Sequence, residues 1–352
     1  MALQQLPKFD ILLPRWYEIT FMDYVDFVSE PHFNDTWLKK ERQIEASLDP
    51  HFTAPKIIPS FRLTDWTAFD FVDFLHSKNN KNLFIDGLIR ECELHVFDGV
   101  HLDLGHLLWM TVTESQTDQQ SFSSNTKACI AFFQILAKEL HEHDLRFYLS
   151  IAYPTFFSSF GNPRFPIVIP QVLFSDRSLD GLFIDPFTNP LLRSGPLSYS
   201  AQTLHHTIDA VLQDTRIAHL LDYTATDAMP TEKIFVGIAF SGQDTSRGRA
   251  RGTVRGPDYL HILKHYKTEL AYDESVGFTA LKYTSSPSFC LKNGTQLERS
   301  VHLPVSTEKE QHICYFPTID TLHDQLQVLQ QKQLNVAVYD LGDGLDYFMD
   351  LF

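Results

Sequence analysis

The chain contains 352 residues and carries 44 acidic against 29 basic side chains, which gives a formal net charge of −15. This balance argues against a nucleic-acid-binding protein, because phosphate backbones require a dense positive surface. No run of 18 apolar residues occurs, so no membrane span is expected. A hydrophobic content of 43% is ample for a buried core. At roughly 150 residues per domain, the length suggests two domains or one large one.

Short β-branched and aromatic runs alternate with helical patterns along most of the chain. Apolar runs that are separated by helices are typical of a parallel sheet covered by helices. The pattern predicts seven strands, at 9–13, 56–63, 100–104, 145–152, 181–184, 233–240 and 335–341. It predicts helices at 35–48, 65–96 (with Asp65 as its N-cap), 126–142, 203–213 and 321–333, and a short one from Leu345.

Seven parallel strands fit either an open doubly wound sheet or an eight-stranded barrel that lacks one member. No GxGxxG or GxxxxGK[ST] motif follows any strand, which disfavours a nucleotide-binding open sheet. A further block over 257–317 begins as a helix and continues as β-hairpin material.

Three stretches resemble a known family. FDGVHLDLG (97–105) is similar to the run DGxDxDxE on the fourth strand of family-18 glycoside hydrolases, the chitinases. KIFVGIAFSG (233–242) resembles the seventh-strand segment, and VAVYDLGDGLDYFMDLF (336–352) resembles the closing strand and helix. The last stretch, with the Pro-rich third strand before Asp65, is typical of the branch of chitinase domain-containing protein 1.

The resemblance covers nearly the whole chain and implies an α/β fold, the (β/α)8 TIM barrel. It implies one barrel domain over 1–352, with 257–317 as a small α+β insertion between strands 7 and 8. The first strand of the family barrel is missing, since only eight residues precede the strand at 9–13. We consider three explanations: a missing upstream segment, a partner chain that covers the open edge, or an internal loop such as 154–170. The first two are favoured.

The departures from the family pattern concern its chemistry. Family-18 enzymes use the N-acetyl group of the substrate as nucleophile, an exception to the two-carboxylate scheme. They need a glutamic acid that protonates the leaving group. Gly105 occupies the position of that acid, and His101 replaces the middle Asp of the series, so only Asp98 and Asp103 remain.

Other positions that hold the acetamide and the sugar ring also differ. The Met-x-Tyr-Asp of the sixth strand maps onto Asp185-Pro186-Phe187-Thr188, and Tyr339 replaces the Trp beneath the sugar. Ser241 replaces the Tyr of the seventh strand. The resemblance therefore implies a catalytically inactive chitinase-like protein that binds a carbohydrate or a protein partner.

Each candidate site residue also has a plainer interpretation. Asp103 and Asp185 could form a relocated acid/base pair, although structural carboxylates inside the barrel are the favoured reading. Trp16, Phe187 and Tyr339, like Tyr153, could stack on sugar rings, but aromatic residues also fill ordinary cores. His101 is the remaining candidate ligand-binding residue.

No metal or other cofactor is expected. His101 with His106, and His261 with His265, have spacings that suit metal ligands, but 16 histidines make such spacings common by chance. The segment 246–256 carries four arginines; it could dock an anionic partner, and a solvated mobile loop is the favoured reading.

The sequence does not determine the cellular compartment of the protein. The first ten residues contain no apolar stretch of a signal peptide, whereas the resemblance implies a secreted or lysosomal setting. The sequons at 34–36 and 293–295 accept glycans only in the secretory pathway. Four cysteines are too few for a disulfide scaffold. Cys290 and Cys314 could pair, whereas Cys92 and Cys129 resemble core residues.

The sequence leaves three hypotheses for the function of the protein. The first is an inactive chitinase-like module that binds an oligosaccharide or a protein. The second is a structural scaffold subunit without sugar binding, and the third is an active glycosidase with relocated carboxylates.

Overall fold

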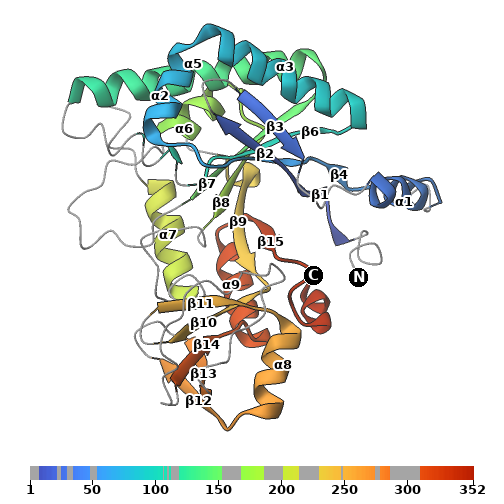
Figure 1. Ribbon diagram of the computed structural model, residues 1–352, viewed down its shortest axis with the longest axis vertical. Helices are drawn as coiled ribbons and strands as arrows, with labels where there is room; N and C mark the ends of the chain where they lie inside the picture. The colour runs from blue at the N-terminus through green and yellow to red at the C-terminus, as the bar shows by residue number, and fades with distance from the viewer. Residues whose placement is uncertain are drawn as a thin grey trace, which may run out of the picture. The chain divides into compact units, whose positions relative to one another are not determined.

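The computed structural model describes residues 8–21, 25–29, 35–47, 54–105, 107–108, 111, 119–152, 168–185, 201–213, 230–246, 249–273, 278–285 and 310–352 (Figure 1). The chain divides into two compact units. Unit 1 comprises residues 1–188 and 209–235, and unit 2 comprises residues 189–208 and 236–352. The division falls within α7 (Ala201–Gln213) and β9 (Ile234–Ala239), and each unit is described by itself.

Unit 1 is built on parallel strands in the order β8-β7-β6-β5-β2, extended at β2 by the antiparallel strand β3. A separate parallel pair joins β1 to β4. The strands are β1 (Ile11–Leu12), β2 (Arg15–Phe21), β3 (Val25–Ser29), β4 (Lys56–Ile57), β5 (Ser60–Leu63), β6 (Gly99–Asp103), β7 (Arg146–Ala152) and β8 (Gly181–Asp185).

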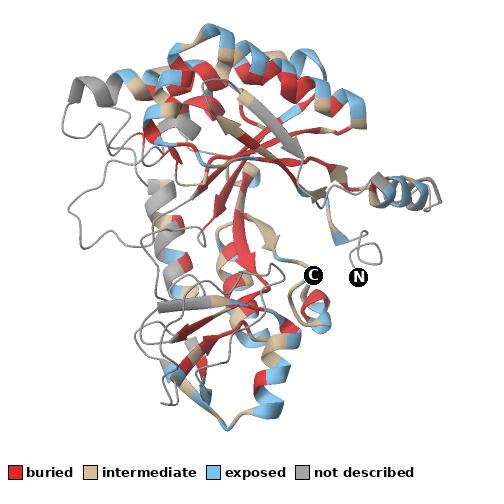
Figure 2. Cartoon of the chain, viewed as in Figure 1, coloured by how far each residue is buried: buried red, intermediate tan, exposed pale blue. Residues whose placement is uncertain are grey.

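Unit 1 also contains helices. They are α1 (Asp35–Ser47), α2 (Ala68–His76), α3 (Lys78–His95), α5 (Gln119–Glu142) and α6 (Val168–Ser175). Helices α2, α3 and α5 lie side by side (Figure 1), and buried residues alternate with exposed ones along them (Figure 2). Their buried faces meet through the edge-on rings of Phe74, Phe84 and Phe132. All five residues of β6 and all five of β8 are buried, as expected for parallel strands with helices on one face and the sheet interior on the other.

Two predicted elements of unit 1 needed correction. The first long strand is Arg15–Phe21, because Pro14 follows only the two-residue strand β1 and ordered pairing with β5 begins beyond it. The predicted helix 65–96 is two helices that meet at Ser77. Its N-cap is Thr67, whose side chain forms a reciprocal capping box with Asp70, whereas Asp65 has a φ of 63°.

Strand β3 pairs with β2 along five residues, from Tyr17 opposite Ser29 to Phe21 opposite Val25. This is the strand edge that the sequence interpretation assigned to a partner chain or to an upstream segment. A segment of the chain itself pairs there, and the internal segment suggested from the sequence, 154–170, lies largely outside the described residues.

Unit 2 contains a five-stranded antiparallel sheet in the order β11-β10-β14-β13-β12. Its strands are β10 (Gly242–Ser246), β11 (Arg249–Val254), β12 (Thr268–Asp273), β13 (Phe278–Ser285) and β14 (Glu310–Tyr315). The other elements are α8 (Gly256–His265), α9 (Ile319–Gln331), β15 (Asn335–Tyr339), and the short 3-10 helices η6 (Thr231–Lys233, in unit 1) and η7 (Asp346–Leu351); β15 neighbours β9.

Most of the described residues of the arginine-rich segment belong to this sheet, because 249–254 form β11. Residues 242–246 and 249–254 form the β10–β11 hairpin, and β10 pairs on its other side with β14. The antiparallel sheet therefore begins at Gly242, before the 257–317 boundary drawn from the sequence. Sequence inspection missed this because the strand that pairs with β10 lies almost 70 residues further along the chain.

None of the helices among the described residues is long and apolar enough to cross a bilayer.

Candidate functional site

The carboxyl end of β6 carries the residues that matched the family signature. Because side chains alternate along a strand, Gly99, His101 and Asp103 share one face, while Val100 and Leu102 face the other way. Register places Asp103 opposite Ser150 of β7 and opposite Arg62 of β5. The inward face of this strand end is therefore polar.

Asp103 is 6% exposed, and polar groups contact both of its carboxylate oxygens. The backbone N–H of Gly105 donates a hydrogen bond to Oδ1 at 2.9 Å. The Arg15 guanidinium lies 3.8 Å from Oδ2, with 47% of the Arg15 side chain exposed. These two contacts fix the Asp103 carboxylate in the structure. Of the ion pair, the Arg15 side chain is the partner that is exposed to solvent.

Gly105, two residues after Asp103, has a backbone conformation that suits glycine. Its φ is +50°, in the left-handed region, which costs other residues about 1–2 kcal/mol. No atom of the described residues lies within 4 Å of the position that a Cβ would take. A side chain here would therefore strain the backbone turn without colliding with a described neighbour.

His101 is a buried imidazole on the same face of β6 as Asp103. Its Nδ1 lies 3.0 Å from Oγ of Ser60, and Nε2 has no hydrogen-bond partner among the described residues. Burial lowers the pKa of His101 from 6.5 to about 4; the Asp103 carboxylate opposes this shift and the Arg15 guanidinium adds to it. The imidazole is therefore neutral at physiological pH.

Aromatic rings lie next to His101. Its ring meets Phe183 of β8 edge-on at 4.9 Å, and Phe183 stacks on Phe235 at 4.6 Å. Tyr148 of β7 lies 5.9 Å from Phe183 and 6.2 Å from Phe235. These rings pack together on the face of the strands that carries His101.

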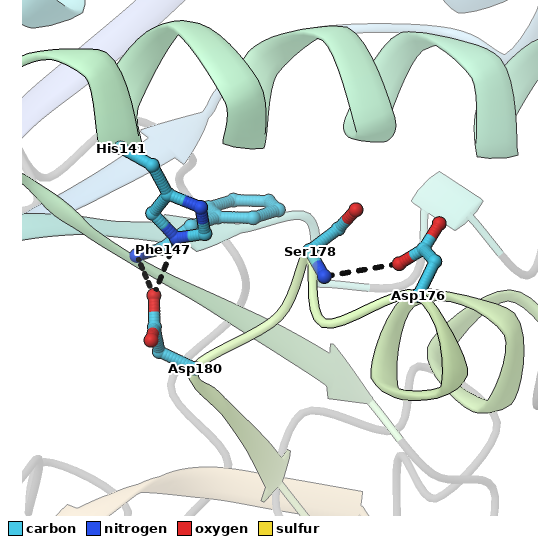
Figure 3. A network of polar contacts seen from close by, with 5 residues as sticks. All are labelled: His141, Phe147, Asp176, Ser178 and Asp180. Atoms are coloured by element: carbon cyan, nitrogen blue, oxygen red, sulfur yellow. Dashed lines mark hydrogen bonds and ion pairs between the residues drawn. The ribbon is translucent and has the colours of Figure 1, made fainter.

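Two aspartates tie the amino ends of strands together in the same way. Asp98, before β6, accepts a 2.8 Å hydrogen bond from the N–H of Ile57, and Asp180, before β8, accepts one of 2.8 Å from the N–H of Phe147. Nε2 of His141 also lies 2.9 Å from Asp180, as Figure 3 shows. Asp98, although it matches the family signature, therefore has a structural role at the opposite end of the strand from Gly105.

No protein-family model matches the chain. A chitinase from Chromobacterium violaceum ATCC 12472 matches 99% of this chain and 92% of its own, with a TM-score of 0.66 and 16% identity. A glycoside hydrolase family 18 N-acetylglucosaminidase from Paenibacillus barengoltzii matches 99% of this chain and 94% of its own, with a TM-score of 0.58 and 13% identity. The fold is that of the family-18 glycoside hydrolases.

YKL-39, solved in the presence of chitooligosaccharides, also has this fold. It matches 99% of this chain and 92% of its own, with a TM-score of 0.59 and 13% identity. At such identities the likeness shows the fold alone. The chemical properties of the site depend on the residues of this chain.

The predicted aromatic candidates do not gather at one place. Trp16 is 6% exposed and meets Trp37 of α1 edge-on at 5.6 Å and Phe97 at 5.9 Å, which favours a core role. Tyr339 belongs to unit 2 and is half-buried at the end of β15. Phe187 lies outside the described residues, as do Tyr153, His106, Cys290, Asn34 and 293–295.

Asp185, the second candidate of a relocated acid pair, ends β8. It is 3% exposed, and register places its backbone opposite Ala152. A general acid must reach the glycosidic oxygen of a substrate, and burial of both Asp103 and Asp185 favours the structural reading of this pair.

Unit 2 places Ser241 and Asp340 together at the ends of β9 and β15. Oγ of Ser241 donates a hydrogen bond of 2.6 Å to Oδ2 of Asp340, whose φ is 56°. Nearby, Arg255 lies 3.4 Å from Asp343. Burial raises the pKa of Asp343, and the Arg255 charge opposes that shift.

Sequence reasoning missed Arg15 and the buried pair of Asp244 with His312. Nδ1 of His312 lies 2.7 Å from Oδ2 of Asp244, and both side chains are at most 3% exposed. The two residues are 68 positions apart, so no local spacing could reveal them. Arg15 lies at the start of a strand, and nothing in its local sequence indicates that it pairs with Asp103.

The described cysteines are buried thiols. Cys92, Cys129 and Cys314 are free. Burial raises the pKa of Cys92 and of Cys129 to about 12, and it raises the pKa of Cys314 as well. No group of three or more His, Cys, Asp or Glu suited to a metal ion occurs within the described part of the chain.

Proposed function

We propose that this chain is a catalytically inactive member of the chitinase-like group that binds a carbohydrate at the carboxyl end of β6. Two features carry the proposal: the resemblance of 97–105 to the family signature aligns Gly105 with the catalytic acid, and the N–H of Gly105 donates a hydrogen bond to Asp103. Removal of a general acid costs about 10²–10⁴ in rate. With His101 neutral and bound to Ser60, the carboxylate series that holds an acetamide is also incomplete.

Binding is supported by the polar groups of this strand end. Arg15, which pairs with Asp103 and is half exposed, has a guanidinium that can donate hydrogen bonds to sugar hydroxyls. Similar folds, such as that of YKL-39, have been solved with chitooligosaccharides, which makes a GlcNAc oligomer the first ligand to test. The carboxyl-terminal run GLDYFMDL supports a place near the chitinase domain-containing protein 1 branch.

The experiment combines a hydrolysis assay with calorimetric titration of GlcNAc tetramer. We expect no turnover, and we expect binding that weakens at least about tenfold, or 1.4 kcal/mol, in Arg15→Ala. Arg90→Ala is the matched control, because Arg90 lies on α3 with 71% of its side chain exposed and should leave affinity unchanged.

Two results would overturn the proposal. Hydrolysis that disappears in Asp103→Ala or Asp185→Ala would show an active glycosidase with relocated carboxylates. Absence of binding to any oligosaccharide on a glycan array and at about 1 mM in solution, which corresponds to about 4 kcal/mol, would favour the scaffold function.

A further inference from the structure

Helix α8 of unit 2 carries two exposed histidines one turn apart, His261 and His265. Their ring centroids lie 4.4 Å apart, and the ring planes differ by 38°. Residues at i and i+4 share a helix face, but many such pairs point their rings apart. Here the two imidazoles already lie against each other.

The helix that carries them is firmly anchored. Ile262, between the two histidines, is fully buried, and Tyr259 stacks on Phe316 at 4.5 Å with an interplanar angle of 11°. The N–H of Tyr266 closes the last turn on the carbonyl of Ile262 at 3.1 Å. The histidine pair is therefore held on a fixed backbone, which reduces the ordering cost of binding a ligand.

The spacing of the rings suits a single metal ion. Imidazole nitrogens bind zinc at about 2.0–2.1 Å, so two nitrogens on one tetrahedral ion lie roughly 3.3 Å apart. Rings whose centroids are 4.4 Å apart can bring one nitrogen each to that separation with small side-chain rotations. The spacing in the sequence could not show this, because it does not fix the rotamers.

The helix dipole also favours a cation at this place. His265 is the last residue of α8, where unpaired carbonyls give the helix end partial negative charge. Lys264, exposed and adjacent to His265, acts against the ion by charge repulsion.

We propose that His261 and His265 form a two-histidine site for a divalent transition-metal ion, with solvent or an external ligand in the remaining positions. No third His, Cys, Asp or Glu joins them among the described residues, so the ion keeps open coordination positions. Imidazole ligands exclude Ca²⁺ and Mg²⁺, which require oxygen donors. Among the divalent ions Cu²⁺ binds most tightly, ahead of Ni²⁺ and Zn²⁺. The site is independent of the proposed carbohydrate binding.

The test is a titration of the full chain with CuCl₂, NiCl₂ and ZnCl₂ in a non-coordinating buffer. His261→Ala and His265→Ala should each abolish the binding of one equivalent of Cu²⁺ or weaken its affinity at least about tenfold. Tenfold is the lower end of the loss seen when a residue that only supports a metal ligand is replaced. Lys264→Ala should strengthen binding, because it removes the repelling charge. His323→Ala is the matched control, since His323 is an exposed helical histidine whose i+4 neighbour is Gln327.

Electron paramagnetic resonance of the bound Cu²⁺ should show two equivalent imidazole nitrogens, and circular dichroism should show that the surface variants remain folded. The proposal is wrong if His261→Ala and His265→Ala bind Cu²⁺ like the wild type, or if only one of them changes the affinity. It is also wrong if His323→Ala has the same effect as either.

Discussion

Gly105 donates its backbone N–H to Oδ1 of Asp103 across 2.9 Å, while its own φ is +50°. Gly105 is therefore part of a tight turn around Asp103. The backbone conformation at this position favours glycine over other residues.

Gly105→Ala should destabilise the protein by about 1–2 kcal/mol, because the new Cβ is strained at a left-handed φ. Gly342→Ala is the matched control: its Cβ would also meet no described atom within 4 Å, but its φ lies outside that region. There the substitution should be neutral or stabilise by up to about 1 kcal/mol through the unfolded state. Denaturant unfolding measures both, and equal effects would refute the strain argument.

The lowered pKa of His101 predicts that the stability of the folded protein depends on pH. Its folded pKa is lowered from 6.5 to about 4, so the unfolded chain binds the proton more readily. Stability should be greatest above pH 6.5 and decrease as the pH falls to about 4, by about 3 kcal/mol in total. His101→Asn keeps a group at the Nδ1 position for Ser60 and should remove this decrease. An unchanged pH profile in that variant would exclude His101 as the cause.

The carboxylates of Asp98 and Asp180 should each contribute to the alignment of neighbouring strands. Asp180→Ala leaves the N–H of Phe147 without its side-chain acceptor, and Asp98→Ala does the same to Ile57. Each should cost about 1–3 kcal/mol. Asp86→Ala, on the exposed face of α3, is the control and should stay within about 0.5 kcal/mol. Hydrogen exchange at the two amides locates the effect.

Replacing only one member of the buried pair Asp244 and His312 should lower the free energy of unfolding. Asp244→Leu or His312→Leu alone leaves a buried polar partner and should cost about 3–5 kcal/mol. The double variant should recover much of that loss, because two apolar groups then replace a buried pair. Additive losses in the double-mutant cycle would show that the two side chains act independently.

The thiols of Cys92, Cys129 and Cys314 should not react in the folded protein. Their pKa values are raised by burial, so almost no thiolate forms at pH 8. In a Cys290→Ser variant, Ellman's reagent should detect no fast thiol before denaturation and three afterwards. A fast thiol in the folded variant would contradict the burial of one of these residues.

The sequence determined the class of fold and most strand positions, because a buried parallel strand needs an apolar run and a covering helix needs a 3.6-residue period. The strands predicted near residues 57, 100, 146, 182, 234 and 336 correspond to β4/β5, β6, β7, β8, β9 and β15. Pro14 interrupts the first apolar run, and the longer strand Arg15–Phe21 lies beyond it. The alignment of Gly105 with the catalytic acid rests on the sequence resemblance alone and stays a prediction.

Only the tertiary structure decided which groups meet. The Arg15 ion pair with Asp103, the Ser60 contact of His101 and the Asp244 pair with His312 join residues separated by 41 to 88 positions, so they depend on strand register and not on local spacing. The same holds for β10, which became a strand through pairing with β14. Local pattern sets what each segment can form, and long-range pairing sets which polar atoms are left to bind one another.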